Sequence, residues 1–233
     1  MEERVKSGVP GLDDILGGGL FRGQTYGITG GPGAGKSILS MEFLVRGAER
    51  GERGLYVTSE VPADKLARQI PFGSLQGHID NGDLIVFSTR PLPGEVTTNT
   101  EKFDLAGLTY MVKHYVRNND IKRVVFDSVN AFVQQYDDRR PLRRELNNLV
   151  AMLESYGCTT LLVFEGDSAT SDPSVEFLVD GVIELGRIET HQDVVRYAQV
   201  RKMRGTAHDL NKRAMEIGEQ GILITNIKPF YGD

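Results

Sequence analysis

A glycine-rich loop of eight residues, Gly30-Gly31-Pro32-Gly33-Ala34-Gly35-Lys36-Ser37, most constrains what this chain can fold into. The spacing G-x-x-x-x-G-K-[ST] is typical of a loop that wraps nucleotide phosphates with inward-pointing backbone N–H groups. Lys36 would supply a positive charge for the β- and γ-phosphates, and the Ser37 hydroxyl can ligate Mg²⁺. The pattern predicts a nucleotide site made by Gly31, Pro32, Gly33, Ala34, Gly35, Lys36, Ser37 and Ile38.

The segments around this loop agree with that prediction. Residues 24–29 are expected to form a short buried strand, and residues 38–48 carry a broad apolar face at helical spacing. A phosphate loop requires a strand before it and a helix after it, so that the helix N-terminus faces the anion.

The remainder of the chain predicts an α/β fold. We expect strands at 55–58, 84–87, 123–127 and 159–164, and helices at 63–70, 104–116 and 142–153, with a polar surface loop at 90–102. Such alternation favours a mostly parallel sheet flanked by helices. Residues 181–185, 194–202 and 222–225 follow as strands without helices between them, which predicts a C-terminal antiparallel extension of the sheet.

Length and composition narrow the classes of protein. The 233 residues contain no linker, internal repeat or low-complexity tract, which favours one domain over residues 1–233. The net charge of −5 argues against a dedicated nucleic-acid surface. Cys158 is the only cysteine, and we interpret it as a buried structural thiol in a reducing compartment. No apolar run reaches about 18 residues, and the charged N-terminus lacks a signal-peptide core, so we expect a cytoplasmic protein with no membrane partner.

Three carboxylates are candidates for the chemistry of a bound nucleotide. Asp127 ends an apolar strand and would hold Mg²⁺ at the carboxyl end of the sheet, or only cap a turn there. Glu60 follows the strand at 55–58 and could orient the attacking water beside the metal, or be an ordinary surface glutamate. Glu165 could sense the γ-phosphate, which is the weakest of the three predictions.

Several segments together resemble the KaiC-type ATPases of the RecA/RadA superfamily, the KaiC/GvpD type. The resemblance covers nearly the whole chain, and it depends on the segments 8–20, 30–37, 123–128, 134–137, 143–146, 180–183 and 202–208. It implies a RecA-like P-loop NTPase core with one KaiC-like domain, whereas the cyanobacterial clock protein carries two in tandem.

The resemblance also implies a site shared between subunits. In KaiC-like proteins the Lys-Met-Arg-Gly-Thr segment lies at a subunit boundary and reaches the neighbour's nucleotide. Carried over, Lys202 and Arg204 would act in trans, and Met203, Thr206 and His208 would line the same nucleotide site. The implied activity is hydrolysis of ATP with Mg²⁺ in a homo-oligomeric ring, a hexamer. Glu60, Lys36, Arg204 and Lys202 would be the catalytic residues, and Ser37, Asp127 and Glu60 would hold the metal.

Two departures from the family pattern leave alternatives open. Many KaiC-type domains carry two adjacent glutamates where this chain has Ser59-Glu60, which predicts slow turnover. No phospho-acceptor occupies residues 175–179, so we do not expect autokinase activity. One alternative is a nucleotide-gated interaction module that recruits an unidentified protein with little hydrolysis.

A recombinase paralogue of the RadA type that binds DNA is a further alternative. It is disfavoured because residues 166–172 contain no lysine or arginine. The basic cluster at 139–144 is interpreted as a solvated helix start or an oligomer contact. The four histidines share no ligand spacing, so we do not expect a metal cage built by the protein.

Overall fold

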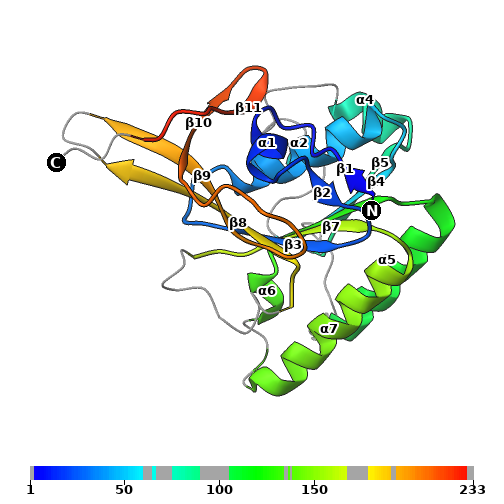
Figure 1. Cartoon of the computed structure of the whole chain (residues 1–233). Helices are drawn as coiled ribbons and strands as arrows, with labels where there is room; N and C mark the ends of the chain where they lie inside the picture. The colour runs from blue at the N-terminus through cyan, green and yellow to red at the C-terminus, as the bar shows by residue number, and fades with distance from the viewer. Residues whose placement is uncertain are drawn as a thin grey trace.

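A nine-stranded β-sheet runs through the described part of the chain, with helices on both of its faces (Figure 1). The computed structural model describes residues 3–59, 65–66, 75–89, 105–133, 136, 138–166, 178–189 and 193–229. Glu60, most of the helix expected at 63–70 and the loop expected at 90–102 lie outside these residues.

Six strands form the parallel part of the sheet, in the order β8-β3-β7-β6-β4-β5. Their bounds are β8 Gly181–Glu189, β3 Thr25–Thr29, β7 Thr159–Val163, β6 Arg123–Asp127, β4 Gly54–Thr58 and β5 Leu84–Ser88. The strands expected in these regions are confirmed. β7 separates the strand that precedes the phosphate loop, β3, from the strand that ends in Asp127, β6.

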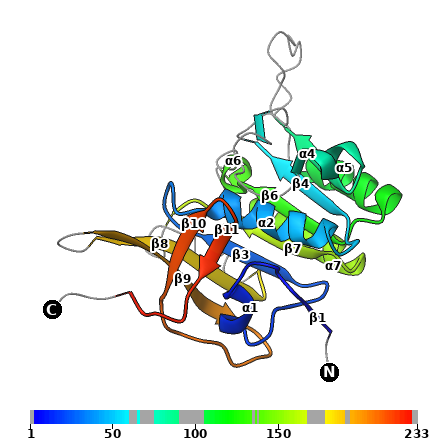
Figure 2. The same ribbon diagram turned by 90° about the horizontal axis from the view of Figure 1, so that it is seen from above.

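The C-terminal strands extend the sheet in antiparallel pairing, as predicted. β9 Val194–Met203 pairs with β8, β10 Arg213–Gly218 pairs with β9, and β11 Gly221–Ile224 forms the edge. β10 was not predicted from the sequence, because its six residues RAMEIG mix charged and apolar side chains without a clear period. Figure 2 shows β8 and β9 projecting together beyond the rest of the sheet.

Helices cover the two faces unequally. α2 Lys36–Ala48 and the short α4 Leu75–Asp80 lie on one face, and α5 Leu105–Asn119 and α7 Arg139–Ser155 lie on the other (Figure 1). α6 Asn130–Val133 follows β6, and α1 Leu12–Ile15 lies between the short paired strands β1 Arg4–Val5 and β2 Leu20–Phe21. Among the described residues, no helix has the length and apolar character needed to cross a membrane.

Two apolar cores result, one on each face of the sheet. Leu39, Phe43 and Leu44 of α2 pack in the first core, and Leu108, Val112 and Leu146 of α5 and α7 pack in the second. Each fully buried leucine contributes about 1.5–3 kcal/mol relative to exposure. Because successive side chains of a strand point to opposite faces, residues of one strand serve both cores.

The N-terminal segment is fastened to the C-terminal strands. Ile224 donates its backbone N–H to the Pro10 carbonyl at 2.9 Å, and Asp209 donates to the Ile15 carbonyl at 3.1 Å. Gly11 has a φ of 79° and lies so close to the Ile224 carbonyl that an added Cβ would sit 1.8 Å from that oxygen. Only glycine fits this contact, which gives a packing reason for the glycine at this position.

A buried arginine, Arg123, begins β6, the strand that the sequence predicts over residues 123–127. Arg123 is 1% exposed and forms an ion pair with Glu52 at 2.6 Å, and it donates to the Phe43 and Lys6 carbonyls at 2.7 and 2.9 Å. Burial lowers the pKa of the guanidinium, and Glu52 opposes that shift. Arg123 therefore joins the N-terminal segment and α2 to the sheet.

Replacing Arg123 with glutamine is expected to lower the free energy of unfolding by about 3–5 kcal/mol, because it removes one partner of a buried ion pair. Urea unfolding followed by circular dichroism measures this. Arg22→Gln is the matched control, since Arg22 contacts the same Glu52 carboxylate at 3.1 Å from an exposed position and should cost about 1 kcal/mol or less. Equal unfolding midpoints for the two variants would contradict the role given to Arg123.

Cys158 is fully buried, which confirms its interpretation as a structural thiol, and burial raises its pKa to about 12. The thiol is thus neutral in the folded protein, while in the unfolded chain it ionises near pH 8.5. The stability that this group contributes is present below about pH 8.5 and is lost as the pH rises above it. We expect iodoacetamide at pH 8 to label Cys158 only after denaturation, and rapid labelling of the native protein would refute the burial.

Candidate nucleotide-binding site

The phosphate loop connects the carboxyl end of β3 to the first residue of α2. Its start is held by two backbone hydrogen bonds, from Gly30 to the Gly166 carbonyl at 2.8 Å and from Gly166 to the Gly30 carbonyl at 3.2 Å. Gly35, with a φ of 105°, lies directly before the helix, and a Cβ there would come within 2.8 Å of Ile217 Cδ1. The glycine thus allows both the left-handed turn and the close packing against β10.

Lys36 begins α2 and folds back over the loop. Its ammonium Nζ donates to the Gly30 carbonyl at 2.8 Å and to the Gly31 carbonyl at 3.0 Å. The first N–H groups of α2 have no partners within the helix and carry the positive end of its dipole. The loop, the ammonium and the helix start together form a place where an anion would be stabilised.

A cleft of about 380 Å³ opens beside this loop. It is lined by Gly33, Gly35, Lys36, Ser37, Ile38, Arg196 and Ile217. Five of these residues belong to the predicted nucleotide site, so the structure brings them together. Gly31, Pro32 and Ala34 belong to the same loop.

Arg196 and Ile217 are the residues of the cleft that sequence reasoning missed. Arg196 pairs with Arg187 in the β8–β9 register, and Arg187 donates to the Pro32 carbonyl at 3.2 Å. Both strands therefore bring arginines to the phosphate-loop edge of the sheet. In the sequence, Arg196 is one charged residue of an alternating strand, and only the strand register places it beside the loop.

Asp127 lies at the carboxyl end of β6, as predicted. It is 6% exposed, so burial extends through this last residue of the strand. Tyr56 on the neighbouring strand donates its hydroxyl to Asp127 Oδ2 at 2.5 Å, and Ser59 donates its backbone N–H to the Asp127 carbonyl at 3.2 Å. The tyrosine hydroxyl explains how a carboxylate can be buried here, since buried charges need hydrogen-bond partners.

The other carboxylates are placed less completely. Glu165 follows β7 and is exposed, and its backbone N–H donates to Asn130 Oδ1 at 2.9 Å. Its neighbour Gly166 pairs with Gly30, so Glu165 lies next to the phosphate loop. Glu60 lies outside the described residues, although Ser59 directly before it is at the same edge of the sheet as Asp127.

Lys202 and Arg204 lie at the opposite end of the parallel strands from their own phosphate loop. Met203 between them pairs with Gly181, which pairs with Tyr26 near the amino end of β3. The loop begins after Thr29, at the other end of the same strand. Within one protomer, the segment 202–204 and the phosphate loop are therefore separated by the length of β3.

These basic side chains have contacts of their own. Lys202 Nζ donates to the Val179 carbonyl at 2.6 Å, and Arg204 Nη1 lies 3.5 Å from Asp180 Oδ1. The Arg204 side chain is 54% exposed, so it is accessible to another molecule. Thr206 Oγ1 donates to the Ala207 carbonyl at 3.2 Å.

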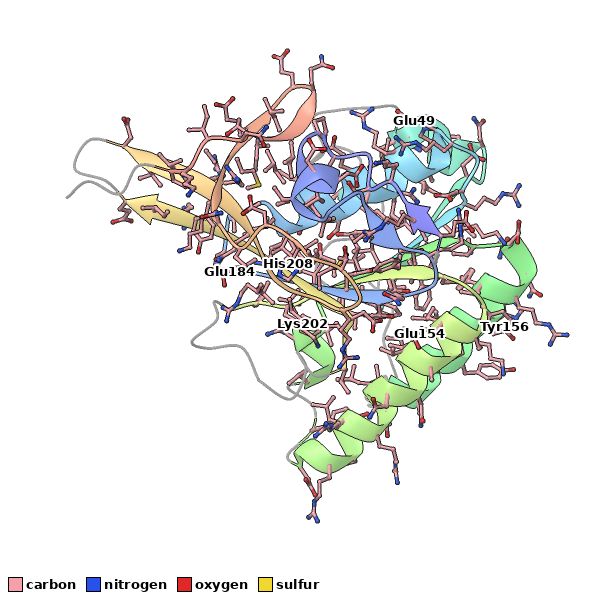
Figure 3. All side chains as sticks on the ribbon, in the orientation of Figure 1. Glu49, Glu154, Tyr156, Glu184, Lys202 and His208 are labelled. Carbon is pink, nitrogen blue, oxygen red and sulfur yellow. The ribbon has the colours of Figure 1, made fainter. Side chains whose placement is uncertain are left out.

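His208 lies further along the same segment. Its two ring nitrogens are inaccessible to solvent and have no hydrogen-bond partner among the described residues. Figure 3 places His208 and Lys202 on the C-terminal part of the chain. The predicted site residues thus form two groups at opposite ends of the parallel strands. The phosphate loop, its cleft and Asp127 lie at the carboxyl end, and residues 202–208 lie at the other end.

Comparison with known proteins identifies the family of the chain. The family model "ATPase: KaiC" matches residues 5–229. A UPF0273 protein of Methanopyrus kandleri is 33% identical over 98% of this chain and 94% of its own length. The circadian clock oscillator protein KaiC of Parathermosynechococcus lividus is 35% identical over 95% of this chain, which spans 42% of that protein's length.

A solved structure shows the same fold. A KaiC-like protein of Pyrococcus horikoshii OT3 superposes with a TM-score of 0.84 and 32% identity, covering 97% of this chain and 100% of that one. Its fold and the parallel sheet with antiparallel C-terminal strands confirm the predicted RecA-like P-loop NTPase core. The chain belongs to the KaiC family of ATP-binding P-loop ATPases.

Proposed function

We propose that this chain is one KaiC-like domain spanning residues 1–233 that hydrolyses ATP to ADP and phosphate at the subunit interfaces of a homo-oligomeric ring, a hexamer. One observation carries the proposal. The phosphate loop and the segment Lys202-Met203-Arg204 lie at opposite ends of the parallel strands, so one protomer cannot bring both to one nucleotide. A head-to-tail contact between copies would bring them together, and repeated head-to-tail contacts form a ring when the rotation between copies closes.

The loop side would bind the triphosphate and its metal. The residues present fit these groups, because an added Cβ at Gly31 would meet nothing within 4 Å, which leaves space along the loop for phosphate. Hydroxyl and carboxylate oxygens are the ligands that Mg²⁺ prefers, and Ser37 and Asp127 supply them. Bound Mg²⁺ would neutralise charge that develops on the phosphates. Lys36 would hold phosphate oxygens, and Glu60 would orient or deprotonate the attacking water.

The basic segment of the next protomer would complete the site. Negative charge spreads over the oxygens of the transferring phosphoryl group, and an arginine from another subunit stabilises it. Arg204 and Lys202 would supply these cations, with Met203, Thr206 and His208 lining the nucleotide.

A regulatory role with little hydrolysis is the second candidate. It is favoured by Ser59, which stands where many KaiC-type domains carry the first of two adjacent glutamates. In this case ATP would hold the ring together so that it recruits a protein partner, and turnover would be incidental. Steady-state phosphate release distinguishes the two candidates, because only the first requires turnover that depends on Arg204.

Light scattering with and without Mg·ATP tests the proposal directly. The ring requires nucleotide to be contacted by two protomers, so we expect Mg·ATP to shift the protein toward the hexamer, with EDTA as the control. A monomer that cleaves ATP at an unchanged rate at every protein concentration would refute the shared site.

A further inference from the structure

One residue is inserted in β9 immediately before the basic segment. β8 and β9 pair antiparallel, but Ile183 faces Val200 whereas Val182 faces Lys202, so Arg201 has no counterpart on β8. Such a β-bulge re-aims the side chains that follow it, and bulges are frequent next to active sites.

The core residues show what this bulge changes. Ala198 and Val200 lie two residues apart in the core on the α2 side, and the next residue of β9 in that core is Met203. A strand without the bulge would place Lys202 there, because side chains alternate with a period of two. The inserted residue instead turns Lys202 and Arg204 to the α7 side of the sheet.

Two observations place these side chains on the α7 side. Lys202 donates to the carbonyl of Val179, a residue of the core on that side. Burial raises the pKa of Glu154 near the end of α7, Asp180 raises it further, and Arg204 acts against both. Figure 3 shows Lys202 on the side of the sheet that faces α7. Without the bulge, the segment could not present both cations at this face.

A buried carboxylate on β8 holds the inserted residue. Glu184 is 5% exposed, and Arg201 Nη1 lies 2.8 Å from its Oε2 while the Tyr197 hydroxyl donates to its Oε1 at 2.6 Å. Glu184 faces Gln199, so Tyr197 and Arg201 are its two diagonal neighbours on β9. Because a buried carboxylate that loses its cation is costly, Arg201 is held in the position that forms the bulge.

We propose that Glu184, acting through Arg201, is a positioning residue that fixes the β9 bulge and thereby directs Lys202 and Arg204 toward the nucleotide of the next protomer. The inference rests on the proposed function, since it explains why the cations that act in trans point toward the next protomer. Glu184 itself would not contact the nucleotide.

Glu184→Gln tests this inference with little change in volume, since the amide can still accept from Tyr197 but carries no charge for Arg201. Misplacement of a catalytic group by about 1 Å can cost about 10²-fold in rate, so we expect kcat to fall by about that factor. The Kd for ATP, which depends on the phosphate loop, should stay within about twofold. Arg201→Leu removes the other partner and should behave alike, Arg201→Lys should restore part of kcat, and Arg22→Gln should leave both constants unchanged.

A mixing experiment then assigns the defect to one side of the interface. The Glu184→Gln protomer keeps its phosphate loop but misdirects its basic segment, so it should regain activity when mixed with Asp127→Asn and gain none with Arg204→Ala. Regain with Arg204→Ala alone would place Glu184 on the loop side and overturn the inference.

Two further outcomes separate this inference from the proposed function. If Arg204→Ala is slow while Glu184→Gln and Arg201→Leu both turn over at the wild-type rate, the positioning role is refuted and the shared site stands. If Arg204→Ala itself turns over at the wild-type rate, the proposed function fails, and the positioning role fails with it.

Discussion

Lys36→Ala is expected to abolish measurable binding of ATP. The ammonium now held by the Gly30 and Gly31 carbonyls would instead contact phosphate oxygens, and each hydrogen bond between charged groups contributes about 1.5–3 kcal/mol. Loss of two such bonds corresponds to roughly 10²–10⁴-fold weaker binding. Isothermal titration calorimetry with Mg·ATP measures the change.

The matched control for this variant is Lys122→Ala. Lys122 pairs with Asp120 at 2.7 Å beside the amino end of β6, away from the phosphate loop, so its loss should leave ATP binding unchanged. Circular dichroism should show both variants folded. If Lys36→Ala bound ATP with an affinity within a few fold of the wild type, the phosphate loop would not be the ATP-binding site.

Arg204→Ala is expected to separate hydrolysis from binding. The guanidinium is exposed and contacts no part of its own phosphate loop, so the Kd for ATP should stay close to that of the wild type. An arginine supplied in trans contributes about 10³–10⁵ in rate, so kcat should fall by about 10³-fold or more. Release of labelled phosphate under single-turnover conditions resolves a loss of this size.

Arg22→Ala provides the comparison for this second variant. Arg22 is also partly exposed and ion-paired, to Glu3 at 3.0 Å, but it lies in the N-terminal part of the chain. Its removal should leave kcat unchanged. Wild-type turnover by Arg204→Ala would reject a trans-acting cation at this position.

The strands and helices with strong patterns could be predicted from the sequence. β4, β6 and β7 contain short apolar runs bounded by polar residues or glycine, and α2 and α7 show helical periodicity, so local preference and burial agree in them. β10 could not be predicted in this way, because its mixed residues become a strand only through pairing with β9 and β11.

The residues of the candidate site also differ in whether the sequence predicts them. The phosphate loop is a contiguous motif, so the sequence predicts its residues, whereas Arg196 and Ile217 reach the cleft only through pairing of distant strands. The burial of Arg123 depends on carbonyls at positions 6, 7 and 43, which no local pattern reveals. The family resemblance supplied Lys202 and Arg204, and the strand register shows that they lie away from their own loop.

The most direct test of the shared site is complementation between two inactive variants. Asp127→Asn impairs the loop side of an interface, and Arg204→Ala impairs the side that the next protomer supplies. In random mixed rings, about a quarter of the interfaces would combine an intact loop side with an intact basic side. We therefore expect an equimolar mixture, with mixed rings verified by two affinity tags, to recover about a quarter of the wild-type phosphate release. Mixed rings with no activity above that of the separate variants would contradict an ATP site built by two protomers.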